Sequence, residues 1–193
     1  MRKALSFLAV LAVLTAGAYV HAQRLMRLDS WELDYKGRPP RVIEIREDMD
    51  LRSYTYVIYE VTNNTDTEID FHPAFEIETN EARIRRAVSR PDVFARINAR
   101  SLHELKPFRS MKGPIRPGET KRGVAIFETV DTAANTLTVY VSGLTGDFVT
   151  RTLEDGQVKA LYRTYKSVYY RPGDGFQVTL EPVSLVSSEW IWR

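Results

Sequence analysis

The chain has 193 residues, of which 27 are lysine or arginine and 25 are aspartate or glutamate, and it contains no cysteine. Residues 1–22 hold two of the bases and no acid, so residues 23–193 carry 25 of each sign. A neutral chain lacks the basic excess of a dedicated nucleic-acid binder, and a chain without cysteine is not a disulfide scaffold.

The first 22 residues have the composition of an export signal. Arg2 and Lys3 precede an uncharged run of 17 residues, and Ala22 ends a Val-His-Ala sequence of the kind that signal peptidase accepts. The uncharged run is short for a bilayer, which needs about 20 residues. We therefore expect cleavage after Ala22 rather than an uncleaved anchor, and no transmembrane span after cleavage. An exported chain without cysteine favours the bacterial periplasm or the extracellular medium.

Residues 23–193 are expected to form a single domain that begins with short strands. Alternation and β-branched or aromatic residues predict strands over residues 31–35, 41–47 and 54–61, followed by a turn at 63–66. Between residues 69 and 77 the odd positions are apolar. Pro73 interrupts this last strand, which indicates a sheet edge or a bulge.

The segment 80–112 breaks the β pattern and is interpreted as a basic, partly helical insertion. Pro91 and Asp92 predict a helix start, and Pro107 is expected to stop the helix. Its apolar side is expected to carry Phe94, Ile97, Leu102 and Leu105.

Residues 113–144 give the clearest pattern of turn, strand, loop and strand. Pro117 and Gly118 form a turn signal, and residues 123–129 and 136–142 are rich in apolar and β-branched side chains. Both runs are apolar on both sides, as in strands covered on both faces. The polar loop 131–135 predicts a hairpin-like unit that a second layer of sheet must cover.

Later strands are predicted at residues 158–170 and 176–180, with a turn at 171–175, and the chain end at 189–192 reads as extended. About seven to nine short strands with regularly spaced turns are typical of a sandwich. The sequence therefore predicts an all-β fold, an antiparallel immunoglobulin-like β-sandwich with one helical insertion.

Two motifs carry a resemblance to a known family. The turn at Ile115, Pro117, Gly118 and Glu119 precedes the strand 123–127, and an earlier strand and turn contain Tyr59, Val61, Asn63, Asn64 and Thr65. These motifs resemble the secreted bacterial immunoglobulin-like domains of unknown function. The resemblance implies an exported adhesion or protein-interaction module, and it transfers no catalytic residue.

Catalytic and metal-binding patterns are not recognised in the sequence. Residues 23–193 contain two histidines, His72 and His103, in no recognised ligand spacing, and there is no Gly-x-Ser-x-Gly or phosphate-binding glycine motif. Glu44, Glu76 and Glu78 fall on the polar side of alternating strands, where a solvated sheet face is favoured over a sugar-binding carboxylate pair. We expect no catalytic residue, no metal and no cofactor.

Charge is distributed unevenly along the chain. Residues 80–122 contain twelve bases and four acids, so the rest of the chain after residue 22 carries an excess of eight acids. Such a segment can attract an envelope protein or an anionic component such as lipid headgroups or lipopolysaccharide. The alternative is that the arginines pair with acidic strands of the same molecule. The binding residues predicted in this segment are Arg83, Arg85, Arg86, Arg96 and Arg100.

The two tryptophans near the chain end form a second candidate surface. Trp190 and Trp192 either cap the sandwich core or remain exposed as an aromatic contact for a partner. The sequence thus predicts an exported, non-enzymatic interaction module that binds another envelope component and does not bind nucleic acid. A carbohydrate- or lipid-directed hydrolase and a structural subunit of an envelope assembly remain the alternatives.

Overall fold

The computed structural model describes residues 30–128, 130, 134–172 and 183–193, and one compact unit spans Trp31–Arg193. The expected export signal, the expected strand at 176–180 and most of the loop at 131–135 lie outside the described residues. The turn expected at 171–175 is described only in part.

The first sheet is built around two long strands, β3 and β9. It contains β1 (Asp34–Gly37), β2 (Arg41–Glu47), β3 (Asp50–Thr62), β7 (Lys106–Pro107) and β9 (Thr120–Glu128). Its order is β1-β3-β9-β7, and β2 pairs with the first half of β3. All pairs are antiparallel except the short pair of β7 with β9.

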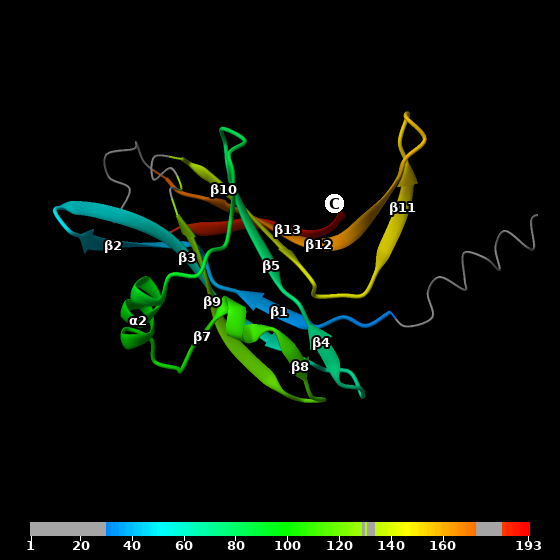
Figure 1. Cartoon of the computed structure of the whole chain (residues 1–193), viewed down its shortest axis with the longest axis horizontal. Helices are drawn as coiled ribbons and strands as arrows, with labels where there is room; N and C mark the ends of the chain where they lie inside the picture. The colour runs from blue at the N-terminus through cyan, green and yellow to red at the C-terminus, as the bar shows by residue number, and fades with distance from the viewer. Residues whose placement is uncertain (1–29, 129, 131–133, 173–182) are drawn as a thin grey trace, which may run out of the picture. The chain divides into compact units, whose positions relative to one another are not determined.

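The second sheet contains β5 (Ala74–Thr79), β6 (Ile84–Arg86), β10 (Thr136–Ser142), β11 (Phe148–Thr152), β12 (Val158–Tyr170) and β13 (Ser184–Trp192). Its order is β11-β12-β10-β5-β6, with β13 on the other side of β12. A two-stranded ladder joins β4 (Ile69–Phe71) to β8 (Gly113–Ile115). Figure 1 shows the strands of the two sheets and the β4–β8 ladder.

The core lies between the two sheets because their strands alternate in side-chain direction. Val57, Tyr59 and Val61 of β3 are buried in one cluster with Ile77 of β5 and Val139 of β10. Two facing sheets that share one buried cluster form a sandwich. The predicted all-β class, with antiparallel sheets and a helical insertion, is confirmed.

A second apolar cluster covers the outer face of the first sheet. Helix α2 (Pro91–Ala99) packs Val93 and Ile97 against Val124 and Ile126 of β9 and against residues of β2 and β3. Because α2 covers one face of β9 and the second sheet covers the other, Gly123 to Phe127 are all buried. The expectation of a strand covered on both faces is confirmed for β9.

The predicted hairpin between residues 123–129 and 136–142 is wrong. Strand β9 pairs with β3 and β7, whereas β10 pairs with β5 and β12 in the other sheet. The expected cover on both faces is also wrong for β10, because its buried residues Leu137, Val139 and Val141 alternate with half-buried ones, so only one face is fully buried. The two strands therefore contribute to opposite sides of the same core.

The helix begins at Pro91 as predicted but is shorter than expected. It ends at Ala99, and Leu102, placed by the sequence on the apolar side, is 98% exposed. Asn98 accepts a hydrogen bond from the backbone N–H of Leu105 through Oδ1 at 3.0 Å. This contact redirects the chain, so Leu105 reaches the second apolar cluster from a loop.

Candidate functional site

The five arginines predicted as binding residues lie on two different elements. Arg83, Arg85 and Arg86 lie on or beside β6, at the edge of the second sheet. Arg96 and Arg100 lie at α2, which packs on the outer face of the first sheet. The structure therefore divides the predicted site into two groups.

The group at β6 makes contacts within the molecule. Arg86 Nε lies 3.0 Å from Glu76 Oε1, and Arg83 Nε lies 3.3 Å from Glu81 Oε2. Arg85 donates a hydrogen bond to the carbonyl of Ile84 at 3.2 Å. Exposed pairs of this kind add little stability, but they neutralise charge locally. For Arg83 and Arg86 the contacts follow the alternative interpretation, in which arginines pair within the chain.

A second group of bases follows the chain from α2 to β8, and we call it the basic strip. Its side chains are exposed and make no hydrogen bond or ion pair with another described residue. Between residues 93 and 118 the sequence contains six bases and one acid, Glu104. The members of the basic strip are Arg96, Arg100, Lys106, Arg109, Lys112 and Arg116.

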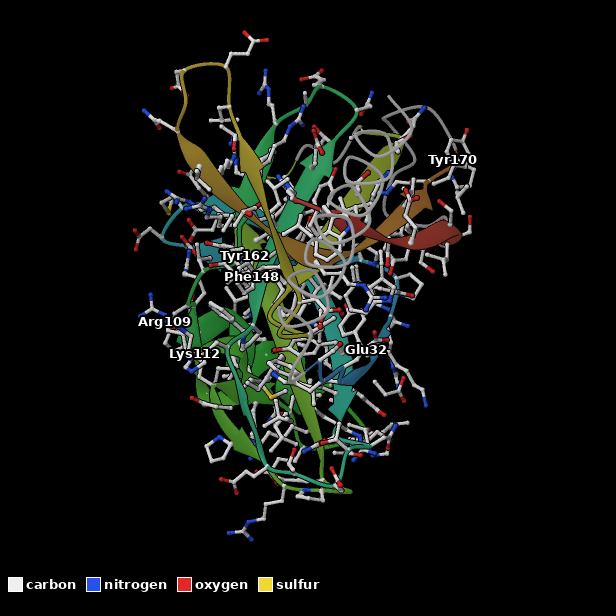
Figure 2. All side chains as sticks on the ribbon, turned by 90° about the vertical axis from the view of Figure 1, so that its right-hand side faces the viewer. Glu32, Arg109, Lys112, Phe148, Tyr162 and Tyr170 are labelled. Atoms are coloured by element: carbon white, nitrogen blue, oxygen red, sulfur yellow. The ribbon has the colours of Figure 1, made fainter. Side chains whose placement is uncertain are left out.

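Three of the elements that carry cations of the basic strip, α2, β7 and η1, contact β9. Strand β7 pairs with β9 through Lys106 and Pro107, and the 3₁₀ helix η1 (Phe108–Met111) follows at once. Met111 of η1 is buried in the sandwich core. This burial fixes the backbone that carries Arg109 and Lys112. Figure 2 shows these two labelled side chains at the same margin of the view. The packing thus places cations from α2, β7 and η1 on elements that contact the same strand.

Arg90 belongs to the same sequence segment but is fully engaged. It donates to Glu47 and Tyr54, to Glu128 at 3.0 Å and to Asp92 at 2.8 Å. Hydrogen bonds from Arg90 lower the pKa of Asp92, and those carboxylates in turn raise the pKa of Arg90. This arginine joins α2 to β2, β3 and β9. All three of its guanidinium nitrogens donate to residues of the chain, so none is left for a ligand.

A small pocket lies between the start of α2, η1 and β9. Its volume is about 80 Å³, and most of its lining is apolar. Two arginines of different character line it, the engaged Arg90 and the exposed Arg109 of the basic strip. A second, wider depression at the turn 116–119 is open to solvent and is lined by Glu68, Arg116 and Glu119.

The two tryptophans near the chain end have different surroundings. Trp190 packs against the sandwich core, with its ring centroid 5.1 Å from that of Tyr165. The guanidinium carbon of Arg163 lies 4.5 Å from the Trp190 ring centroid. Trp192 is 47% exposed, so it is the tryptophan of the pair that a partner can reach.

Apart from Trp192, sequence reasoning missed the exposed apolar surface of β11, β12 and β13. Nine of the thirteen exposed large apolar side chains in the described part of the chain belong to these strands or to the β11–β12 turn. Phe148 and Tyr162 face each other on the β11–β12 hairpin, with ring centroids 6.2 Å apart, and both are labelled in Figure 2. Asp155-Gly156, a typical hairpin turn pair, is the signal that could have revealed this hairpin.

Of the three carboxylates considered in the sequence analysis, Glu44 is exposed without a described partner, whereas Glu76 and Glu78 contact other side chains. Glu76 contacts Arg86 and lies 2.8 Å from Arg193, and Glu78 accepts a hydrogen bond from Tyr140 at 2.6 Å. Burial and the contact with Glu78 raise the pKa of Tyr140 to about 12. His72 contacts Asp70 at 2.9 Å, and among the described residues no three potential ligands are grouped for a metal ion.

Within the described residues no helix is both long and apolar enough to cross a membrane. Comparison of the chain with protein-family models, curated proteins and solved structures finds no match.

Proposed function

We propose that this chain is an exported, non-enzymatic interaction module that binds an anionic component of the cell envelope through the basic strip. The observation that carries the proposal is the set of six exposed cations without side-chain partners in the described part of the chain. Clustered cations of this kind raise the local concentration of an anionic partner. Export is supported by the composition of residues 1–22.

This surface differs in part from the one expected from sequence. Arg96 and Arg100 remain in it, whereas Arg83 and Arg86 at β6 pair with acids of the same molecule. Arg109 of η1 and Lys112, which directly follows η1, belong to it although the sequence did not single them out. Because the chain after residue 22 is neutral, the attraction of an anion would come from this local group of cations and not from the net charge of the protein.

The test compares two variants with equal charge change. In the first, Arg96→Glu, Arg100→Glu and Lys112→Glu reverse three charges of the basic strip. In the second, Arg83→Glu, Arg85→Glu and Arg86→Glu reverse three charges at β6. Each protein, purified after expression of the full chain, is used to capture components from an envelope extract. We expect the wild type and the β6 variant to retain the same component and the strip variant to lose it.

Folding of each variant is checked by circular dichroism and by the midpoint of urea denaturation. Equal loss in both variants would show that total charge, not the basic strip, decides retention. Retention by the strip variant would refute the proposed binding surface.

A second candidate function is that of a structural subunit in an envelope assembly. The exposed apolar side chains of β11, β12 and β13 favour it, because large exposed apolar patches usually mark protein contacts. Strand β13 pairs only with β12 among the described strands, so it presents a sheet edge.

A further inference from the structure

The pocket between α2, η1 and β9 is a defined apolar recess beside the basic strip. Its walls are formed by Pro91, Phe94, Pro107, Phe108, Val124 and Ile126. Pro91 and Phe94 come from α2, Pro107 from β7 and Phe108 from η1, and the branched side chains come from β9. A recess with this lining favours an apolar group over water.

The volume of the pocket limits the group that fits. At about 80 Å³ it has roughly half the volume of the 150 Å³ cavity that holds benzene. Complete small-molecule ligands need about 300–1,000 Å³. The pocket therefore suits a single aliphatic side chain of three or four carbons, as in valine or leucine, and excludes an aromatic ring.

The charges around the pocket define what lies next to that aliphatic group. Arg90 is engaged by Glu47, Asp92 and Glu128. Arg109 is exposed, and its side chain contacts no acid among the described residues. A carboxylate, like a phosphate, can bind a guanidinium through two parallel hydrogen bonds, and a carboxylate is the smaller of the two groups. An aliphatic group and a carboxylate on neighbouring atoms would satisfy both features.

The basic strip distinguishes between possible sources of that carboxylate. A free amino acid can contact only the pocket and Arg109. The acidic residues that precede the C-terminal residue of a peptide can in addition contact the exposed cations of the basic strip. Charge complementarity thus favours a chain end over a free amino acid.

We propose that this pocket binds the C-terminal residue of an acidic segment of a partner protein. The aliphatic side chain of that residue occupies the pocket, and its terminal carboxylate binds Arg109. The inference rests on the proposed function, since it names the anionic partner of the basic strip.

The test uses four fluorescent octapeptides with the same acidic sequence, titrated against the full chain by fluorescence anisotropy. One ends in valine with a free carboxylate, one is its C-terminal amide, and two end in phenylalanine or serine with free carboxylates. We expect the valine acid to bind about tenfold more tightly than each of the others. The amide loses one charge-assisted contact, and the other two peptides lose the burial of the aliphatic side chain.

Two variants locate the carboxylate. Arg109→Gln should weaken the valine acid more than the amide, so that the difference in affinity between the two peptides is lost. Lys112→Gln removes the same charge outside the pocket lining, so it should weaken the acid and the amide equally. Both positions are exposed, so neither variant is expected to impair folding.

Equal binding of the acid and the amide, or equal effects of the two variants, would overturn the pocket assignment. Peptide binding that depends on Arg96, Arg100 and Lys112 would in that case still support the basic strip. Binding to phosphatidylglycerol vesicles with no binding to any peptide would overturn the proposal of a protein partner and indicate a lipid surface as the anionic partner. Binding to neither probe overturns the inference, and the envelope capture then decides the proposed function separately.

Discussion

At some core positions the neighbouring side chains leave no room for a larger residue, and Gly123 is the clearest example. It lies opposite Tyr59 in the β3–β9 ladder. A Cβ atom at position 123 would come within 2.8 Å of both Tyr59 Cζ and Met111 Cγ. The Tyr59 ring cannot move aside freely, because it is fully buried and its centroid lies 4.4 Å from that of Phe75.

We expect Gly123→Ala to lower the free energy of unfolding by about 1–3 kcal/mol, as overpacking of a core usually does. Urea denaturation followed by tryptophan fluorescence measures this change. Tyr59→Phe is the companion variant, because the Tyr59 hydroxyl is buried without a hydrogen-bond partner among the described residues. Its loss should leave stability equal or higher. A Gly123→Ala protein as stable as the wild type would contradict the packing argument.

Residue roles of this kind could not be predicted from the sequence. Gly123 was recognised only as the start of a strand, since the residue opposite it depends on the register of two distant strands. Arg90 counted as one base among twelve, yet its partners Glu47 and Glu128 lie far from it along the chain. Only Asp92, two residues after Arg90, is a local partner, and it does not reveal the contacts with the distant strands.

At the scale of elements, strand bounds were predictable where the pattern is local. The predicted strands at 41–47 and 158–170 agree with β2 and β12. Pro73 separates β4 from β5, as an interrupted strand implies. Strand pairing was harder to predict from the sequence, because β9 and β10 are neighbours in sequence but pair with strands of different sheets.

Two short motifs that are separate in sequence meet in the structure. Asn63 is fully buried, and its Nδ2 donates to the carbonyls of Thr67 and Ile115, both at 2.8 Å. Its backbone carbonyl accepts from the N–H of Gly118 at 2.7 Å. The turn after β3 therefore holds the turn before β9. Both turns were predicted, but the contact between them was not, because it depends on tertiary packing.

Arg90 also acts at this scale, because it connects α2 with three strands. Contacts with Tyr54 and then Arg90 lower the pKa of Glu47, and contacts with Arg90 lower that of Asp92. A carboxyl with a lower pKa in the folded state binds fewer protons there than in the unfolded state. Its contribution to stability is therefore present above the unfolded pKa, near 4, and is lost as the pH falls through the folded pKa.

We expect the urea midpoint of the wild type to fall as the pH decreases from 5 to about 3. In Arg90→Met the pKa values of Asp92 and Glu47 should rise toward their ordinary range. The variant is then less stable at pH 7, and its midpoint depends less steeply on pH below 5. Arg96→Met, which removes a base with no described partner, should retain the wild-type slope. Parallel slopes for wild type and Arg90→Met would contradict the assigned contacts.

For the whole molecule, the sequence predicted the class of the fold but only part of the candidate surface. Alternating strands and a Pro91 helix start are local signals, and they suffice for an all-β sandwich with a helical insertion. Whether the bases form one surface depends on where β6, α2 and η1 lie in the fold. The structure places Arg83 and Arg86 beside acids and leaves Arg96 and Arg100 without them.

The exposed strands β11, β12 and β13 raise a question of assembly. All five residues of β11 are exposed, and β11 pairs only with β12 in the described part of the chain. A two-stranded hairpin alone is marginally stable in water, so its apolar residues gain from a covering partner. In Figure 1 the hairpin extends away from the packed sheets, where such a partner can reach it.

If the chain is a subunit of an assembly that includes copies of itself, the hairpin should drive self-association. Sedimentation velocity over a range of concentrations should show association for the wild type and its loss in a variant with Phe148→Ser and Tyr162→Ser. A control with Met49→Ser and Leu102→Ser removes two apolar side chains that are 95% and 98% exposed elsewhere, and it should associate like the wild type. Equal loss in both variants would indicate that surface apolarity in general causes association. A wild type that stays monomeric at every concentration would exclude self-assembly through this hairpin and leave the basic strip as the contact surface to pursue.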